Sequence, residues 1–182
     1  MPRNHACGCY QVGVRLILAT GHMRVFNSEP FPPVTIEADS GYWSGDIELS
    51  GAMLSMAIYI DSAVADAKLE DAARMLKGLA DLRKRGLAAI GTSAASDETT
   101  VRDFFQFHLE EVPDSLPEAV RAEATNDAFV GALVLCGVAI HADEDFAFQL
   151  VLDFSFGRQH SDELLAVKFS PDGSVRQVSH ES

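Results

Sequence analysis

The chain has 182 residues, of which 47% are hydrophobic and 23% are charged, and its formal net charge is −13. These proportions are typical of a folded globular protein, and the length favours one domain with a continuous core. A strongly acidic surface repels phosphate groups, so nucleic acid and anionic membranes are disfavoured as partners. The same surface attracts a basic protein partner over long range.

The first 22 residues differ from the remainder, because they contain two arginines but no Asp or Glu and carry two of the three cysteines. Their longest apolar run, residues 16–19, is too short for a membrane span or a signal-peptide core. We therefore expect residues 1–22 to be a disordered or non-native extension and residues 23–182 to form a single domain. Cys136 is the only thiol of that domain, which excludes a disulfide framework there and favours a reducing cytoplasm.

Three strands are expected after a proline-containing extended segment. Apolar and polar residues alternate over residues 34–38 and residues 52–60, and less regularly over residues 42–49. Gly45, inside the second of these strands, indicates a bulge or a close approach of another group. Short breaks containing Gly and Ser separate the strands, which is typical of an antiparallel meander.

The period then changes to that of an amphipathic helix over residues 65–86. Acids crowd its start and bases its end, and Gly86 is suited to a left-handed cap, so one helix ending there is predicted. One helical face combines the following residues: Leu69, Ala72, Ala73, Leu76, Leu79, Ala80 and Arg83.

Further helices are predicted over residues 87–96, interrupted at Gly91, and over residues 96–112. Pro113 and Pro117 indicate a loop after them. A last short helix is expected within residues 125–135, although this apolar run could equally join the strand that follows it.

The last third of the chain has the period of strands. Four are expected, over residues 135–142, 146–157, 164–170 and 175–182, the last being a strand or a tail. The element order is β-β-β-α-α-α-β-β-β-β. Strands segregated from helices indicate an α+β fold with a largely antiparallel sheet and helices packed on one face.

One acidic stretch with a histidine has the composition of a metal site: His141, Asp143, Glu144 and Asp145. Its spacing matches no established ion-binding loop, and it falls between two predicted strands, so a solvated turn is favoured. The sequence contains no recognisable catalytic or phosphate-binding motif. We predict no catalytic residues, no metal ligands and no cofactor.

Three other side chains with reactive groups have simpler structural interpretations. His160 lies near Arg158 and Asp162, which would allow a site on a loop, but a polar surface loop is favoured. His108 is on the apolar side of its helix, where a core-edge histidine is expected. Cys136 lies within a predicted strand and is expected to be buried and inert.

The single tryptophan, Trp43, stands beside Tyr42 among the carboxylates of Asp39, Asp46 and Glu48. The favoured interpretation is structural, with Trp43 packed on the helix layer and Tyr42 facing outward. The functional interpretation is that these five residues form an aromatic and acidic surface that binds a basic protein.

Residues 34–51 (VTIEADSGYWSGDIELSG), the central amphipathic helix and residues 164–182 (LLAVKFSPDGSVRQVSHES) resemble a family of small bacterial proteins defined as a domain of unknown function. The resemblance covers residues 25–182 and carries no catalytic residues. Some proteins of similar size, acidity and α+β organisation are immunity proteins against bacterial toxins, so the analogy of type favours that role.

A non-enzymatic, acidic protein-binding module is therefore the favoured function. The alternative is a hydrolase or a metal-dependent enzyme that uses His141 with its acidic neighbours, or His160. Homodimerisation through a sheet edge or a helix face stays open.

Overall fold

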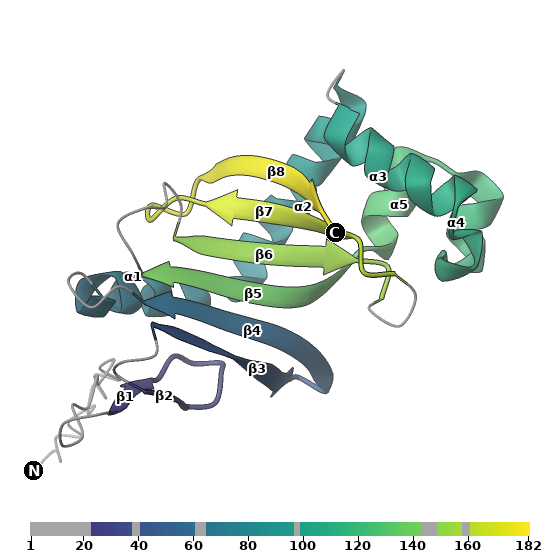
Figure 1. Ribbon diagram of the computed structural model, residues 1–182. Coiled ribbons are helices and arrows are strands. Elements are labelled where there is room, and N and C mark those ends of the chain that lie inside the picture. Colours follow the sequence, from purple (N-terminus) through teal and green to yellow (C-terminus); the bar gives the residue numbers. More distant parts are fainter. Residues whose placement is uncertain (1–22, 38–40, 61–64, 97–98, 143–148, 158–160) are drawn as a thin grey trace, which may run out of the picture.

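The computed structural model describes residues 23–37, 41–60, 65–96, 99–142, 149–157 and 161–182, and it has the predicted α+β architecture (Figure 1). The strands are β1 (Met23–Phe26), β2 (Val34–Glu37), β3 (Tyr42–Leu49), β4 (Ala52–Ile60), β5 (Val134–Ala142), β6 (Leu150–Ser155), β7 (Leu164–Phe169) and β8 (Val175–Glu181). The helices are α1 (Ala65–Lys77), α2 (Leu79–Ala95), α3 (Thr99–Glu110), the short 3-10 helix η1 (Pro113–Ser115), α4 (Glu118–Glu123) and α5 (Asn126–Ala132).

Six strands form one sheet in the order β3-β4-β5-β6-β7-β8, and β1 and β2 form a separate antiparallel pair. Within the large sheet, four neighbouring pairs are antiparallel and one pair, β4 with β5, is parallel. All the helices lie between β4 and β5 in the chain, so they supply the crossover that a parallel pair requires. The predicted largely antiparallel sheet is confirmed, with a parallel junction that was not anticipated.

The helices cover one face of this sheet, as predicted. Figure 1 views the sheet from its other face, with α1 and α2 behind the strands and α3, α4 and α5 grouped at the upper right. On β4, Met56 and Ile58 point toward the helices, and their partners on β5, Val138 and Ile140, are buried beside them. Burial of each such side chain stabilises the fold by about 1.5–3 kcal/mol.

The helical region differs from the prediction in its boundaries. The single helix expected over residues 65–86 is two helices, α1 and α2, which are separated at Gly78. The predicted cap at Gly86 is wrong, because this residue lies inside α2, which continues through Gly91 to Ala95. A Cβ atom on Gly86 would lie 3.1 Å from Cζ of Phe154, so glycine there permits close packing of α2 on the sheet.

Three other elements were not predicted. Strand β1 precedes the expected first strand, and η1 and α4 occupy the region where only a loop was expected. Pro113 begins η1 and Pro117 precedes α4, so both prolines start a helix, where a missing N–H has little cost. The ambiguous run after Thr125 contains α5 and then β5, and the Thr125 hydroxyl caps α5 by accepting from the Ala128 amide at 3.2 Å.

No helix in the described part of the chain has the length and apolarity needed to cross a membrane.

Candidate functional site

The face of the six-stranded sheet opposite the helices carries the residues that the sequence singled out for binding. We call this surface the open sheet face, and among the described elements no helix packs on it. Strand alternation and pairing assign the following polar and aromatic residues to it: Tyr42, Ser44, Asp46, Glu48, Ser55, Tyr59, His141, Asp153, Ser155, Lys168, Gln177, Ser179 and Glu181.

Strand β3 is an edge of the sheet, and its two faces separate the predicted binding residues. Tyr42, Asp46 and Glu48 are exposed on the open sheet face. Trp43 points to the helix side of the sheet and is half-buried against the core. This placement agrees with a structural role for Trp43. Asp39 lies outside the described residues. The structure thus brings three of the five predicted residues together and removes Trp43 from the group.

Gly45 is the reason that Trp43 can lie flat along its own strand. A Cβ atom on Gly45 would be 3.0 Å from Cζ2 of the indole, which is closer than a side chain tolerates without movement. The close approach predicted for Gly45 is therefore an approach of its neighbour Trp43.

Three aromatic rings form a row across strands β3, β4 and β5. Tyr42 is paired in register with Tyr59, which is paired in turn with His141. The two tyrosine rings are tilted with their centroids 5.0 Å apart, and the Tyr59 and His141 rings are stacked at 4.6 Å with an angle of 6°. The row is graded in exposure, since Tyr42 is 46% exposed, Tyr59 is 37% exposed and His141 is buried.

Tyr59 keeps its proton to a higher pH than an ordinary tyrosine. Partial burial is the main cause of its raised pKa, and the nearby Tyr42 and Asp153 add to the effect because ionisation would place like charges together. The phenol is therefore a neutral hydroxyl at physiological pH. It offers both a hydrogen-bond donor and an aromatic surface to anything that docks on the open sheet face.

Beside this row the open sheet face contains a hollow of about 330 Å³, to which five neighbouring strands contribute. Small residues of β4 and β5, such as Ala57 and Ala139, contribute to its lining, together with Tyr59 and His141. Asp153 also lines the hollow, and its carboxylate lies over Gly137 on the neighbouring strand. A Cβ atom on Gly137 would be 2.6 Å from Oδ2 of Asp153, so glycine makes room for this carboxylate.

The charged groups of the hollow are partly neutralised. Nζ of Lys168 lies 3.0 Å from Oε1 of Glu181, and the Ser179 hydroxyl donates to the same oxygen at 2.7 Å. Burial acts to raise the pKa of Glu181, but the Ser179 hydrogen bond and the Lys168 ammonium outweigh it, and the pKa lies below its usual range. Two carboxylates, those of Asp153 and Glu181, and one lysine line the hollow, so its formal charge is negative.

The other predicted candidates lie elsewhere or outside the described residues. His141 belongs to the aromatic row, whereas Asp143, Glu144, Asp145 and His160 are not among the described residues. Within the described part of the chain, no three His, Cys, Asp or Glu side chains are grouped so that they could hold a metal ion. The enzymatic alternative stays a prediction, which elemental analysis of the purified protein tests.

His108 and Cys136 are buried, as predicted. The His108 side chain is 0% exposed, and its Nδ1 lies 2.9 Å from the carbonyl oxygen of Phe104. Burial lowers the pKa of His108, so the ring is neutral at pH 7 and Nδ1–H donates to that oxygen. The Cys136 thiol donates to the backbone oxygen of Asp153 at 3.3 Å and has the surroundings of a structural cysteine.

Comparison with known proteins found no matching family model, no matching curated protein and no matching solved structure. The resemblance of the sequence to a bacterial family of unknown function therefore stays a prediction.

The sequence reasoning missed four contributors to this surface: Tyr59, Asp153, Lys168 and Glu181. Their alternation with buried neighbours was visible and indicated a shared polar face on each strand. The missing information was the strand order, since β4 lies about seventy residues before its parallel partner β5.

Proposed function

We propose that this protein is a non-enzymatic binding module that engages a basic protein partner through the open sheet face. The observation that carries this proposal is the exposure of Tyr42 on the edge strand β3 and of Tyr59 on the neighbouring strand β4, on the same sheet face as the carboxylates of Asp46 and Glu48. Met53, which is 61% exposed on the same face of β4, extends the apolar area. Aromatic anchors with a charged periphery are the usual composition of a protein-binding surface.

The two tyrosines are suited to act as anchors because neighbouring groups already hold them. Tyr59 is stacked on His141, and Tyr42 contacts Tyr59. A pre-ordered ring loses little conformational freedom on binding, so more of its buried area contributes to affinity. Each phenol also retains a hydrogen-bonding group at its tip.

The charges of this surface favour a basic partner. Asp46 and Glu48 project from the edge strand, and the adjacent hollow adds Asp153 and Glu181 against one lysine, Lys168. The whole chain carries −13, so a basic protein is attracted before contact and oriented by the acidic patch. A lysine or arginine side chain of that partner that enters the hollow would meet the carboxylates of Asp153 and Glu181.

Toxin neutralisation is the member of this functional class that we favour. An immunity protein needs only a stable scaffold and a surface complementary to its toxin, and it needs no catalytic residues. The acidic surface, the exposed tyrosines and the α+β scaffold support this assignment. This assignment depends on analogy of type and is the more specific part of the proposal.

Charge reversal tests the proposal with a matched control. The wild-type chain serves as bait in a pull-down from the native cell, and any captured partner is then titrated against variants. Glu48→Lys is expected to weaken binding severalfold and to make the affinity less sensitive to salt, because it removes part of the attraction that salt screens. Tyr59→Ala is expected to weaken binding by about thirtyfold. Asp103→Lys makes the same charge change on the exposed side of α3 and is expected to leave affinity nearly unchanged.

All variants must retain the thermal unfolding midpoint of the wild type within a few degrees. Equal affinity of the Glu48→Lys, Tyr59→Ala and wild-type chains for the captured partner would contradict the proposal. Capture of an acidic partner would contradict its electrostatic part.

A further inference from the structure

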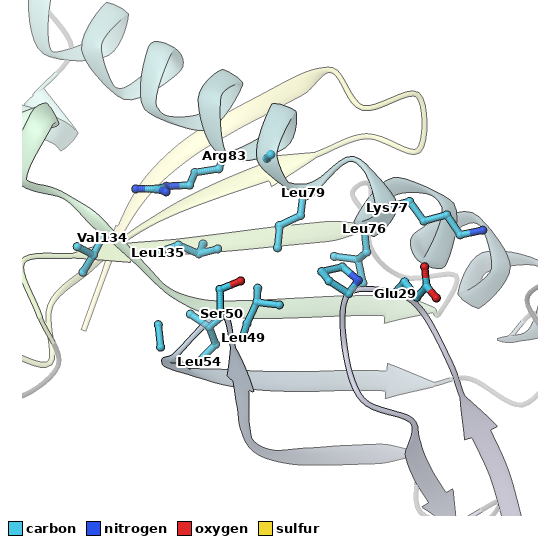
Figure 2. Close-up of a pocket in the computed structure, with 13 residues that line it drawn as sticks. Glu29, Leu49, Ser50, Leu54, Leu76, Lys77, Leu79, Arg83, Val134 and Leu135 are labelled. Carbon is cyan, nitrogen blue, oxygen red and sulfur yellow. The ribbon is translucent and has the colours of Figure 1, made fainter. Parts of the chain in front are cut away.

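A second concave site lies on the helix side of the sheet, away from the open sheet face. It is a groove of about 790 Å³ where the β3–β4 hairpin extends past the junction of α1 and α2 (Figure 2). This volume is in the range of small-molecule sites. We call it the hairpin groove, and it is lined by Glu29, Pro30, Leu49, Ser50, Ala52, Leu54, Leu76, Lys77, Leu79, Ala80, Arg83, Val134 and Leu135.

The lining of the hairpin groove is mainly aliphatic and comes from separate elements. Leu54 of β4, Leu76 of α1 and Leu79 of α2 line the groove from the buried core, and Leu135 of β5 is half-buried. Because four packed elements supply these side chains, the apolar surface is pre-formed. A ligand that fills it gains hydrophobic stabilisation without reorganising the protein.

The charge of the hairpin groove is opposite to that of the protein. The chain has 27 acids and 14 bases, but the groove is lined by two bases, Lys77 and Arg83, and one acid, Glu29. Figure 2 shows Glu29 and Lys77 at one end, whereas Arg83 reaches from α2 toward Val134 at the other end. Among the described residues, neither base has an ion-pair partner.

The position of Arg83 follows from the helical repeat. It lies four residues after Leu79, so both side chains project from the same side of α2 into the groove. The sequence already places this arginine on the apolar face of its helix. A cation at the end of an apolar groove is complementary to a molecule with an apolar body and one anionic end.

We infer that the hairpin groove binds an apolar monocarboxylate of the fatty-acid class. The alkyl body lies along Leu54, Leu79 and Leu135, and the carboxylate accepts hydrogen bonds from the Arg83 guanidinium. This site is independent of the protein-binding surface proposed above, which is built from the opposite face of the sheet.

Calorimetric titration of the full chain with three probes of equal chain length tests this inference, at concentrations below micelle formation. The probes are dodecanoate, dodecanol and dodecyltrimethylammonium. Dodecanoate is expected to bind saturably with one site and to bind at least about tenfold more tightly than the other two, since a charged hydrogen bond contributes at least that factor.

Two variants and a control locate the site. Arg83→Gln is expected to weaken dodecanoate binding about tenfold, because it removes the guanidinium that bonds the carboxylate, and to leave dodecanol binding unchanged, because the aliphatic lining stays in place. Ala80→Phe fills part of the groove and is expected to weaken both ligands. Lys84→Gln, which removes a neighbouring exposed charge that does not line the groove, is expected to change neither.

Any of three results would overturn the inference. These are the absence of saturable dodecanoate binding, equal binding of all three probes, and equal effects of the Arg83 and Lys84 substitutions. The Arg83→Gln chain is expected to keep full affinity for a protein partner captured through the open sheet face, so the two proposals fail separately.

Discussion

The packing of α2 on the sheet predicts opposite effects for the same substitution at two glycines of one helix. Both Gly86→Ala and Gly91→Ala gain about 1 kcal/mol of helix propensity. At Gly86 the new methyl group would lie 3.1 Å from Cζ and 3.2 Å from Cε2 of Phe154, whose ring is fully buried and would have to shift within the packed core. Such overpacking costs about 1–3 kcal/mol. At Gly91 the nearest atom, Cγ2 of Val130, is 4.0 Å away, which is ordinary contact.

Gly91→Ala is therefore expected to stabilise the protein by up to about 1 kcal/mol, and Gly86→Ala is expected to lie about 1–3 kcal/mol below it. Urea unfolding followed by far-ultraviolet circular dichroism measures the difference, provided that the two variants have equal m-values. Equal stabilisation by both substitutions would refute the close approach of α2 to β6.

Three further predictions concern individual groups. Burial holds the pKa of His108 below its ordinary 6.5, so the unfolded chain binds the extra proton. The contribution of neutral His108 to the free energy of unfolding should be fully present above pH 6.5. It should fall as the pH is lowered further, by at most about 1.4 kcal/mol per pH unit. Urea unfolding of His108→Gln at the same pH values should lack this fall. Gly173 has φ +77° and its carbonyl accepts from Nη1 of Arg85 at 2.5 Å, so Gly173→Ala should cost about 1–2 kcal/mol in the same assay. Tyr59 should ionise above the usual range in an alkaline titration read at the tyrosinate absorbance band, and a profile for Tyr59→Phe that retains this late transition would contradict its assignment.

Local periodicity predicts the strands well and the helix ends poorly. The bounds expected for β3 and β4 agree with the structure, because both strands have one buried and one wetter face and alternate accordingly. The break at Gly78 and the continuation through Gly86 were not predicted. Glycine has the same appearance in a sequence whether it ends a helix or permits close packing, and only the tertiary contact with Phe154 distinguishes the two.

The candidate site could be predicted only in part, for a related reason. Tyr42, Asp46 and Glu48 share one strand, so alternation alone places them on one face. Tyr59 and His141 become neighbours through the parallel pairing of β4 with β5, which depends on a crossover of more than seventy residues. Sequence spacing carries no record of that pairing.

Hydrogen exchange of the complex with a partner captured from the cell tests the proposed binding surface most directly. Amides of β3 and β4, over residues 42–60, are expected to gain protection on binding, because the partner covers the part of the open sheet face that carries Tyr42 and Tyr59. Amides of α3, on the helix side, are expected to exchange as in the free protein. Protection confined to the helices, with β3 and β4 unchanged, would contradict the account.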